Sequence, residues 1–214
     1  MNAAAQTVAG NSSRKFLLGR LHSLMGIVPL GLFLLEHLFS NVTAAFGSAA
    51  FNHQVAVLHA IPLLPVLEIL LIFLPLVYHA GYGIYLAYIS KNNVNKYQYA
   101  RNWMFALQRL TGIVTLLFVG YHVWMLRVAN WLSGTEISYQ IVQDHLSTAW
   151  IALFYVIGVV STSFHFTNGL GAGLITWGVT IGKHSQKIAA WLMFILFLIL
   201  SAIGIGSVVS FWIA

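Results

Sequence analysis

Five apolar segments of this sequence are each longer than the about 20 residues that a helix needs to cross a bilayer. They lie at 21–46, 63–90, 103–128, 148–177 and 188–212. The chain is 59% hydrophobic and 7% charged, with a mean hydropathy of +0.84. A soluble domain of this length could not bury so much apolar surface. The sequence therefore predicts an all-α integral membrane protein, with one domain at 1–214 built as a bundle of five transmembrane helices.

Basic residues indicate how this bundle is oriented. They gather before the first segment, between the second and third, and between the fourth and fifth: Arg14, Lys15, Arg20, Lys91, Lys96, Arg101, Lys183 and Lys187. The other two connections, 47–60 and 130–147, contain no Lys or Arg. The positive-inside rule then places the N-terminus in the cytoplasm and the C-terminus outside, with the first helix retained. This bias accounts for the net charge of +6, so no nucleic-acid partner is expected.

Histidine is the plentiful ligand type in this chain. There are nine histidines and no cysteine, which excludes disulfides, iron–sulfur clusters and covalently attached haem on the chain itself. Four of the histidines lie inside separate apolar segments: His37, His79, His122 and His165. Because ionisable groups in hydrocarbon are costly, these four are candidates for function.

The four histidines differ in their predicted depth. Counting about 1.5 Å per residue from the flanking charged residues places His37 and His122 in the outer half of the bilayer. The same count places His79 and His165 at mid-depth or nearer the inside. Of the three ways to pair four ligands, only His37 with His122 and His79 with His165 matches the depths.

Two imidazoles on facing helices at one depth suit a six-coordinate b-type haem. Small residues near the histidines would let the macrocycle approach: Gly81, Gly83, Gly120, Gly169 and Gly171. A zinc or copper site would gather the histidines at one depth, whereas these occupy two. The alternative is that each histidine only hydrogen-bonds a neighbouring helix.

A second set of polar residues lies at the inner ends of the predicted helices. It comprises Arg20, His22, Ser23 and Lys183. Each is placed to pair with a haem propionate, or alternatively to anchor its helix at the membrane interface. The other histidines fall in loops or at helix ends, where we expect them to be solvated or interfacial.

Several short motifs carry a resemblance to a known family. They are GRLHSLMG (19–26), EHL around His37, FLPLVYHAGYGIY (73–85), RNWMFALQRLTGI (101–113), GYHVW (120–124) and FHFTNGL (164–170). Together they resemble the di-haem cytochrome b membrane anchor of succinate dehydrogenase and fumarate reductase. The resemblance is strongest to the five-helix, single-chain type of menaquinone-using bacteria. It spans nearly the whole chain and is weak in the first dozen residues and the outer loops.

The resemblance implies two b haems, with His79 and His165 on the iron of the proximal haem and His37 and His122 on that of the distal one. It implies a flavoprotein subunit carrying FAD and an iron–sulfur subunit on the cytoplasmic face of a bacterial membrane. Such an anchor does not bind succinate. As a subunit of succinate:quinone oxidoreductase, in the respiratory chain and tricarboxylic acid cycle, it passes electrons to menaquinone.

Quinone reduction needs protons as well as electrons, which draws attention to two carboxyl groups inside the predicted helices. Glu68 precedes His79 by eleven residues, so it shares a helix face with His79 and lies about 16 Å further outward. Glu36 is next to His37. Both are candidates for quinone protonation, or alternatively for a bond to a neighbouring helix. Because both lie in the outer half, we expect electron transfer to a low-potential quinone to be electrogenic.

Two other functions remain open from the sequence. One is the haem b anchor of another respiratory enzyme, such as a formate dehydrogenase or hydrogenase. The other is a structural anchor or transporter whose histidines join helices. The working direction, succinate oxidation or fumarate reduction, is not specified by the sequence.

Overall fold

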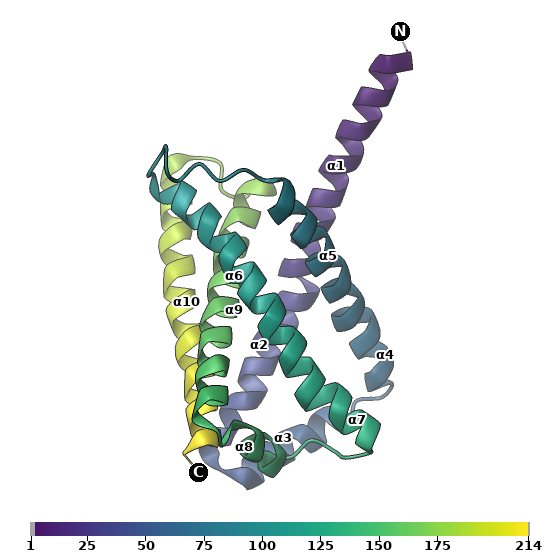
Figure 1. The fold of residues 1–214 in the computed structure, drawn as a ribbon, viewed down its shortest axis with the longest axis vertical. Coiled ribbons are helices and arrows are strands. Elements are labelled where there is room, and N and C mark those ends of the chain that lie inside the picture. The colour runs from purple at the N-terminus through teal and green to yellow at the C-terminus, as the bar shows by residue number, and fades with distance from the viewer. Residues whose placement is uncertain (1–2, 214) are drawn as a thin grey trace.

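The computed structural model describes residues 3–213, with side chains from residue 13 onward, so residues 1–2 and 214 of the expected domain lie outside the described residues. Within that range the chain is helical, without strands (Figure 1). Five helical stretches there are long and apolar enough to cross a membrane, at Ser13–Phe46, Leu64–Ile89, Ala100–Ser133, Ala149–Thr176 and Lys183–Trp212. The all-α, five-helix fold is therefore confirmed.

The first stretch is divided at a proline. Helix α1 covers Ala3–Ile27, α2 covers Pro29–Val42, and a 3-10 turn, η1, follows at Thr43–Phe46. Pro29 is the first residue of α2, a position where its missing N–H is not needed. The Leu32 N–H still donates to the Val28 carbonyl at 3.0 Å, so the two helices continue in nearly one direction.

The second and third stretches each contain a π-helical segment. Helix α4 (Leu64–Glu68), η2 (Ile69–Phe73) and α5 (Leu74–Ile89) form the second. Helix α6 (Ala100–Val123), η3 (Trp124–Val128) and α7 (Ala129–Ser133) form the third. In η2 the Leu74 N–H bonds the Ile69 carbonyl, five residues back, directly before Pro75. Such π segments occur frequently at functional sites.

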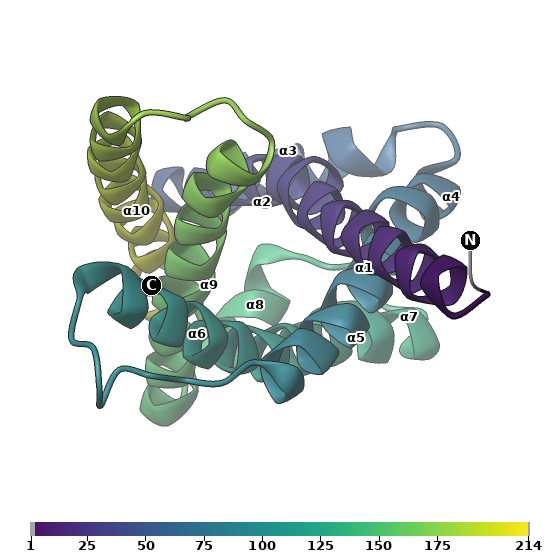
Figure 2. The same cartoon turned by 90° about the horizontal axis from the view of Figure 1, so that it is seen from above.

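Helices α9 (Ala149–Thr176) and α10 (Lys183–Trp212) are uninterrupted. Helix α9 contacts α1, α6 and α10, and Figure 2 shows it end on between α10 on one side and the remaining helices on the other. Glycines permit these close approaches, as is common between membrane helices. Gly158 faces the ring of Phe118, and a Cβ at Gly204 would lie 2.5 Å from Val159.

One end of the bundle, which we name the capped end, is covered by α3 (Ser48–His59) and α8 (Tyr139–Leu146) (Figure 1). The Tyr139 N–H donates to Asn52 at 2.8 Å, joining α8 to α3. The main cluster of buried side chains gathers here, and comprises Ala44, Phe51, Phe118, Tyr139, Val142, Leu146, Ala152, Tyr155, Val208 and Phe211.

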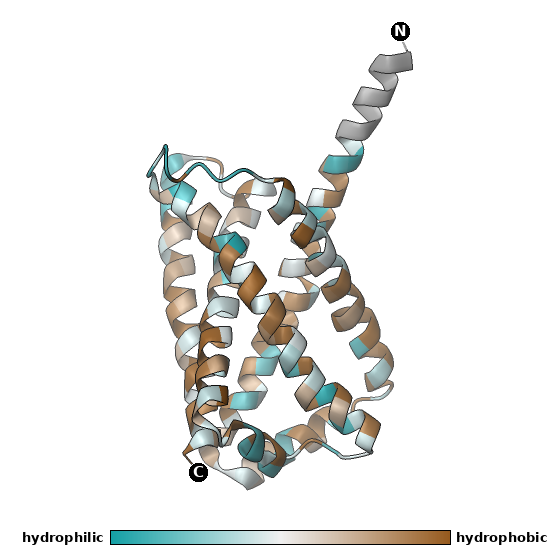
Figure 3. Cartoon of the chain, in the orientation of Figure 1, coloured by the Kyte–Doolittle hydropathy of each residue, from teal (hydrophilic) through white to brown (hydrophobic). Residues whose placement is uncertain are grey.

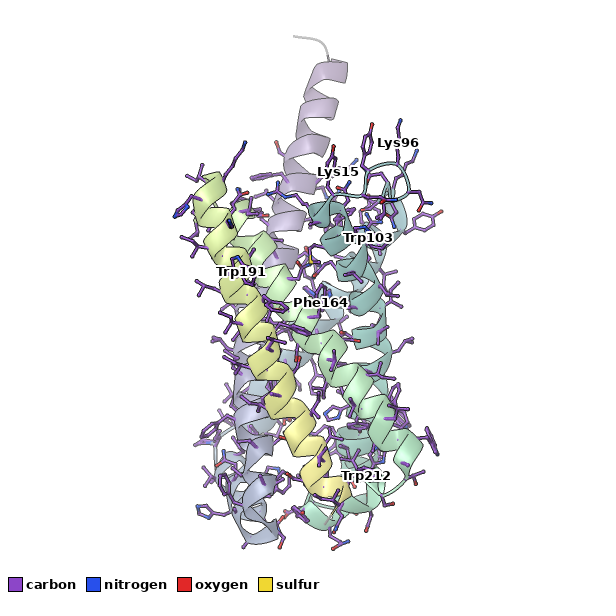
Figure 4. All side chains as sticks on the ribbon, turned by 90° about the vertical axis from the view of Figure 1, so that its left-hand side faces the viewer. Lys15, Lys96, Trp103, Phe164, Trp191 and Trp212 are labelled. Atoms are coloured by element: carbon purple, nitrogen blue, oxygen red, sulfur yellow. The ribbon has the colours of Figure 1, made fainter. Side chains whose placement is uncertain are left out.

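The opposite end, which we name the basic end, carries the connections 90–99 and 177–182, and the N-terminal part of α1 projects beyond the bundle there (Figure 1). Lys15 and Lys96 lie at this end and Trp212 at the other (Figure 4). Arg109 donates to the Ser90 carbonyl at 3.0 Å, which holds the C-terminal end of α5 against α6. Hydrophilic residues concentrate toward the two ends, and the middle is mostly hydrophobic (Figure 3).

Candidate functional site

The four intramembrane histidines lie in two pairs inside the bundle. His79 of α5 meets His165 of α9 with ring centroids 6.1 Å apart and planes at 82°. His37 of α2 meets His122 of α6 with centroids 5.6 Å apart and planes at 83°. The structure thus brings together the same residues that the depth argument pairs.

The ring of His79 is held by helix α1. Its Nδ1 lies 3.0 Å from the backbone carbonyl oxygen of His22. The His22 ring stacks on it at 4.2 Å between centroids, with an interplanar angle of 4°. The ring also packs against Gly26, where a Cβ would overlap it. Only glycine at this position leaves the imidazole room to reach the carbonyl.

The ring of His165 is held in the same way by α6. Its Nδ1 lies 3.0 Å from the Gln108 carbonyl oxygen, and a Cβ on Gly112 would lie 2.8 Å from its Cε1. The Gln108 side chain adds a hydrogen bond from Nε2 to the His165 carbonyl at 3.0 Å, and accepts one from Asn168 at 2.7 Å. In both cases the histidine ring is held by a backbone carbonyl and by a glycine four residues later on the same neighbouring helix.

These carbonyl contacts decide which nitrogen of each ring is free. A carbonyl oxygen only accepts hydrogen bonds, so these contacts favour a proton on Nδ1 of His79 and of His165; Nδ1 of His165 also lies 3.2 Å from the amide Nε2 of Gln108. Nε2 of a neutral ring then presents its lone pair. Among the described residues, neither Nε2 has a hydrogen-bond partner. This is the arrangement that orients a metal-binding histidine.

The His37–His122 pair has a different surrounding. Nδ2 of Asn41 lies 3.4 Å from Nε2 of His37 and donates to its carbonyl at 2.8 Å. Nδ1 of His122 is buried without a partner in the described part of the chain. Aromatic rings enclose the pair, with Phe118 and Tyr155 each 5.7 Å from the His122 ring.

Tyr155 links this pair to the capped end. Its hydroxyl lies 3.0 Å from Nε2 of His145, on α8. Burial lowers the pKa of the His145 imidazole, so this ring is neutral near pH 7. A hydrogen bond therefore connects His145 of α8 to Tyr155, and the ring of Tyr155 contacts His122.

Three buried side-chain nitrogens toward the basic end lack a hydrogen-bond partner among the described residues. They are Nε of Arg20, Nε2 of His22 and Nη2 of Arg109. The Arg20 guanidinium lies over the rings of Phe16 and Trp177 at 4.8 and 4.9 Å. Sequence reasoning assigned no role to Arg109. An arginine ten residues into a helix, followed by an apolar run, was the available signal.

The remaining predicted residues lie as follows. Ser23 faces Gly173 of α9, and Lys183 is exposed as the first residue of α10. A Cβ at Gly81 or Gly120 would meet nothing within 4 Å. Of the other predicted small residues, Gly83 faces His22, Gly169 faces Gln108 and Gly171 faces Met193.

Both carboxyl groups have partners. Glu68 forms an ion pair with Arg127 at 2.5 Å, and these are the only residues in an ion pair in the described part of the chain. The pair joins the residue that precedes η2 to a residue of η3. Glu36 accepts a hydrogen bond from Ser40, whose hydroxyl accepts another from Gln54 of α3. Sequence reasoning missed the role of Arg127 because its partner is 59 residues away.

The two histidine pairs fit a metal bound between two imidazoles better than a metal held by three or more side chains gathered at one point. No group of three or more His, Asp or Glu side chains converges among residues 13–213. Metal–imidazole bonds of about 2 Å would separate two axial nitrogens by about 4 Å, and the ring centroids by roughly 6 Å. The separations in the structure, 5.6 and 6.1 Å, agree with that spacing.

Comparison with known proteins identifies relatives with the same membrane character. Residues 92–203 match the family model described as succinate dehydrogenase/fumarate reductase transmembrane subunit. The chain is also 45% identical over 201 residues to the succinate dehydrogenase cytochrome b558 subunit of Bacillus subtilis (strain 168). That match covers 94% of this chain and 99% of the relative. The chain therefore belongs to the succinate dehydrogenase/fumarate reductase transmembrane subunit family, as a multi-pass bacterial membrane protein.

Proposed function

We propose that this chain is the di-haem cytochrome b anchor of a succinate:menaquinone oxidoreductase. The observation that carries the proposal is the presence of two histidine pairs at two levels of the bundle, each with ring centroids about 6 Å apart. A single structural histidine needs no such partner. The relative's name, a cytochrome b558 subunit, supports haem b as the cofactor.

Each pair would hold one haem b. His79 and His165 would ligate one iron, and His37 and His122 the other. The buried donors Arg20, His22 and Arg109 would meet carboxylates of the haem nearer the basic end. When bound, the two haems supply one-electron carriers between an iron–sulfur donor and a quinone. The chain's own part is to fix the imidazoles and to exclude water.

The basic end would face the cytoplasm. All three basic segments of the described chain gather there, as the positive-inside rule requires of cytoplasmic connections. The iron–sulfur subunit, with the flavoprotein subunit beyond it, would dock on this end. Electrons would then enter at the basic end and reach menaquinone near the capped end, on the outer side.

The Glu68–Arg127 pair would lie at the quinone site. Arg127 follows His122 by five residues, which places the pair near the outer histidines. The ion pair occupies the Glu68 carboxyl group, so its oxygens would become available to a quinone only when this contact loosens. The π segments on both sides of the pair are places where a backbone can adjust. Glu36, bonded to Ser40, is the second candidate.

The first prediction tests the histidine pairs. In a reduced-minus-oxidised spectrum of membranes, His37→Leu and His122→Leu should remove or alter the same b-type component. His79→Leu should alter the other, because each iron loses one of two ligands. His53→Leu, at an exposed position on α3, is the matched control and should leave both components unchanged. A component shared by His37 and His79 would contradict the pairing.

The second prediction concerns Glu68. Glu68→Gln should retain both b-type components and lower menaquinone reduction on the order of 100-fold, the scale of a lost general acid–base group. Glu136→Gln removes an exposed carboxyl group before α8 and should leave turnover unchanged. Undiminished quinone turnover in Glu68→Gln would remove this residue from the site, without affecting the haem assignment.

The third prediction follows from the orientation. Two electrons moving outward across the whole bilayer gain about 4.6 kcal/mol per 100 mV of inside-negative potential. In sealed vesicles holding such a potential, succinate oxidation by menaquinone should slow when an uncoupler is added. Succinate oxidation by a soluble acceptor that bypasses the membrane chain is the control and should not slow. Equal turnover with and without the uncoupler would contradict the proposed electron route.

A further inference from the structure

A cavity of about 330 Å³ opens between α1 and α5 at the basic end, and none of the four paired histidines lines it. It is lined by Arg14, Lys15 and Leu18 of α1 and by Tyr82 and Tyr85 of α5. Its volume falls in the range of small-molecule sites. The wall contains two cations and two phenols, which are donors suited to an oxyanion.

The cations of this cavity are not neutralised by the protein. In the described part of the chain, neither Arg14 nor Lys15 has a hydrogen bond or ion pair. The four acidic residues of the sequence lie toward the capped end: Glu36, Glu68, Glu136 and Asp144. The sequence before Arg14 contains no acidic residue either. The cavity is therefore positive and has no carboxylate from its own chain.

The tyrosines form a fixed wall rather than two loose side chains. Tyr78 and Tyr82 stack with ring centroids 6.0 Å apart, and Tyr82 meets Tyr85 at 5.6 Å. The Tyr78 hydroxyl donates to the Leu18 carbonyl at 3.0 Å, which fastens α5 to α1 just below the cavity. Among the described residues, the hydroxyls of Tyr82 and Tyr85 make no hydrogen bond, so both remain available as donors.

An apolar surface continues from the cavity toward the middle of the bundle. On α1, Leu18 is followed one turn later by Leu21, whose side chain is 39% exposed. On α5, Gly81 lies one turn from Tyr85, and a Cβ there would meet nothing within 4 Å. The surface thus combines a cationic pocket at the membrane boundary with an uncovered apolar strip leading into the hydrocarbon.

From this combination we infer that the cavity binds the phosphodiester headgroup of an anionic phospholipid of the same leaflet, with an acyl chain along Leu21 and Gly81. Basic pockets between transmembrane helices on the cytoplasmic side are suited to such headgroups. A free phosphate would use the cations but not the apolar strip. A partner protein would need an acidic, raised surface, and the tyrosines at the bilayer boundary favour a lipid instead.

The experiment uses the full chain purified in a neutral detergent and titrated with phosphatidylglycerol. Native mass spectrometry counts retained lipid, and the thermal unfolding midpoint reports stabilisation by ligand. Arg14→Gln with Lys15→Gln should weaken phosphatidylglycerol binding on the order of 30-fold and abolish retention of one lipid per chain. Lys91→Gln with Lys96→Gln is the matched control: it removes the same charge from the same end, and should retain that lipid.

Three further arms identify the source of the ligand. Phosphatidylcholine should give no comparable stabilisation, and orthophosphate at the same concentration should not reproduce the effect of phosphatidylglycerol. Tyr82→Phe with Tyr85→Phe tests the phenols without changing charge, and should weaken binding less than loss of the cations. Equal retention in the Arg14/Lys15 variant and wild type would overturn the inference. Stabilisation by orthophosphate equal to that by phosphatidylglycerol would also overturn it.

Discussion

The hydrogen bond between an imidazole Nδ1 and a backbone carbonyl is the interaction on which the interior depends. It is made twice, from His79 to His22 and from His165 to Gln108, at 3.0 Å each time. In hydrocarbon, the alternative for an imidazole N–H is to remain unsatisfied, which costs several kcal/mol. The bond therefore fixes the ring and leaves Nε2 directed away from the helix that holds it.

This bond requires a glycine one turn beyond the carbonyl, and the chain provides it both times. Gly26 follows His22 by four residues, and Gly112 follows Gln108 by four. Each glycine lies under the imidazole that it admits. A side chain at either position would push the ring away from the carbonyl, so the helix packing and the donor geometry depend on the same residues.

The fold and the grouping of the candidate ligands could be read from the sequence to a large extent. Long apolar segments predict helices because no other open structure satisfies its backbone in lipid. Depth, counted along a helix, groups His37 with His122 and His79 with His165. These are local properties of each segment, and the structure places the same rings in contact.

The contacts between segments could not be read in this way. Gly26 and Gly112 lie on helices other than those of the histidines that they admit. Sequence reasoning therefore selected glycines close to the histidines in the sequence and did not select these two. The Glu68–Arg127 pair joins residues 59 positions apart, and counting along one helix does not reveal such a partner. The π segment before Pro75 likewise depends on backbone hydrogen bonding near a residue without an N–H. There the Leu74 N–H bonds the Ile69 carbonyl, five residues back, and the sequence does not reveal this choice.

The two ends of the bundle differ in structure and in charge. Helices α3 and α8 close the capped end over a cluster of aromatic side chains that includes Phe51 and Phe211. The basic end is open and positive, with cations that have no carboxylate within the chain. This asymmetry is what a subunit needs if soluble partners and lipid headgroups meet one end and quinone meets the other.

Ferric electron paramagnetic resonance of the purified complex tests the central claim most directly, because it would report the spin state and the imidazole planes of each haem that the proposed pairs would hold. With imidazole planes at 82° and 83°, both irons should be low-spin and should show the strongly anisotropic signals of nearly perpendicular axial rings. Integration should give two such haems per chain. A high-spin signal in the intact complex, or a single haem per chain, would contradict the account.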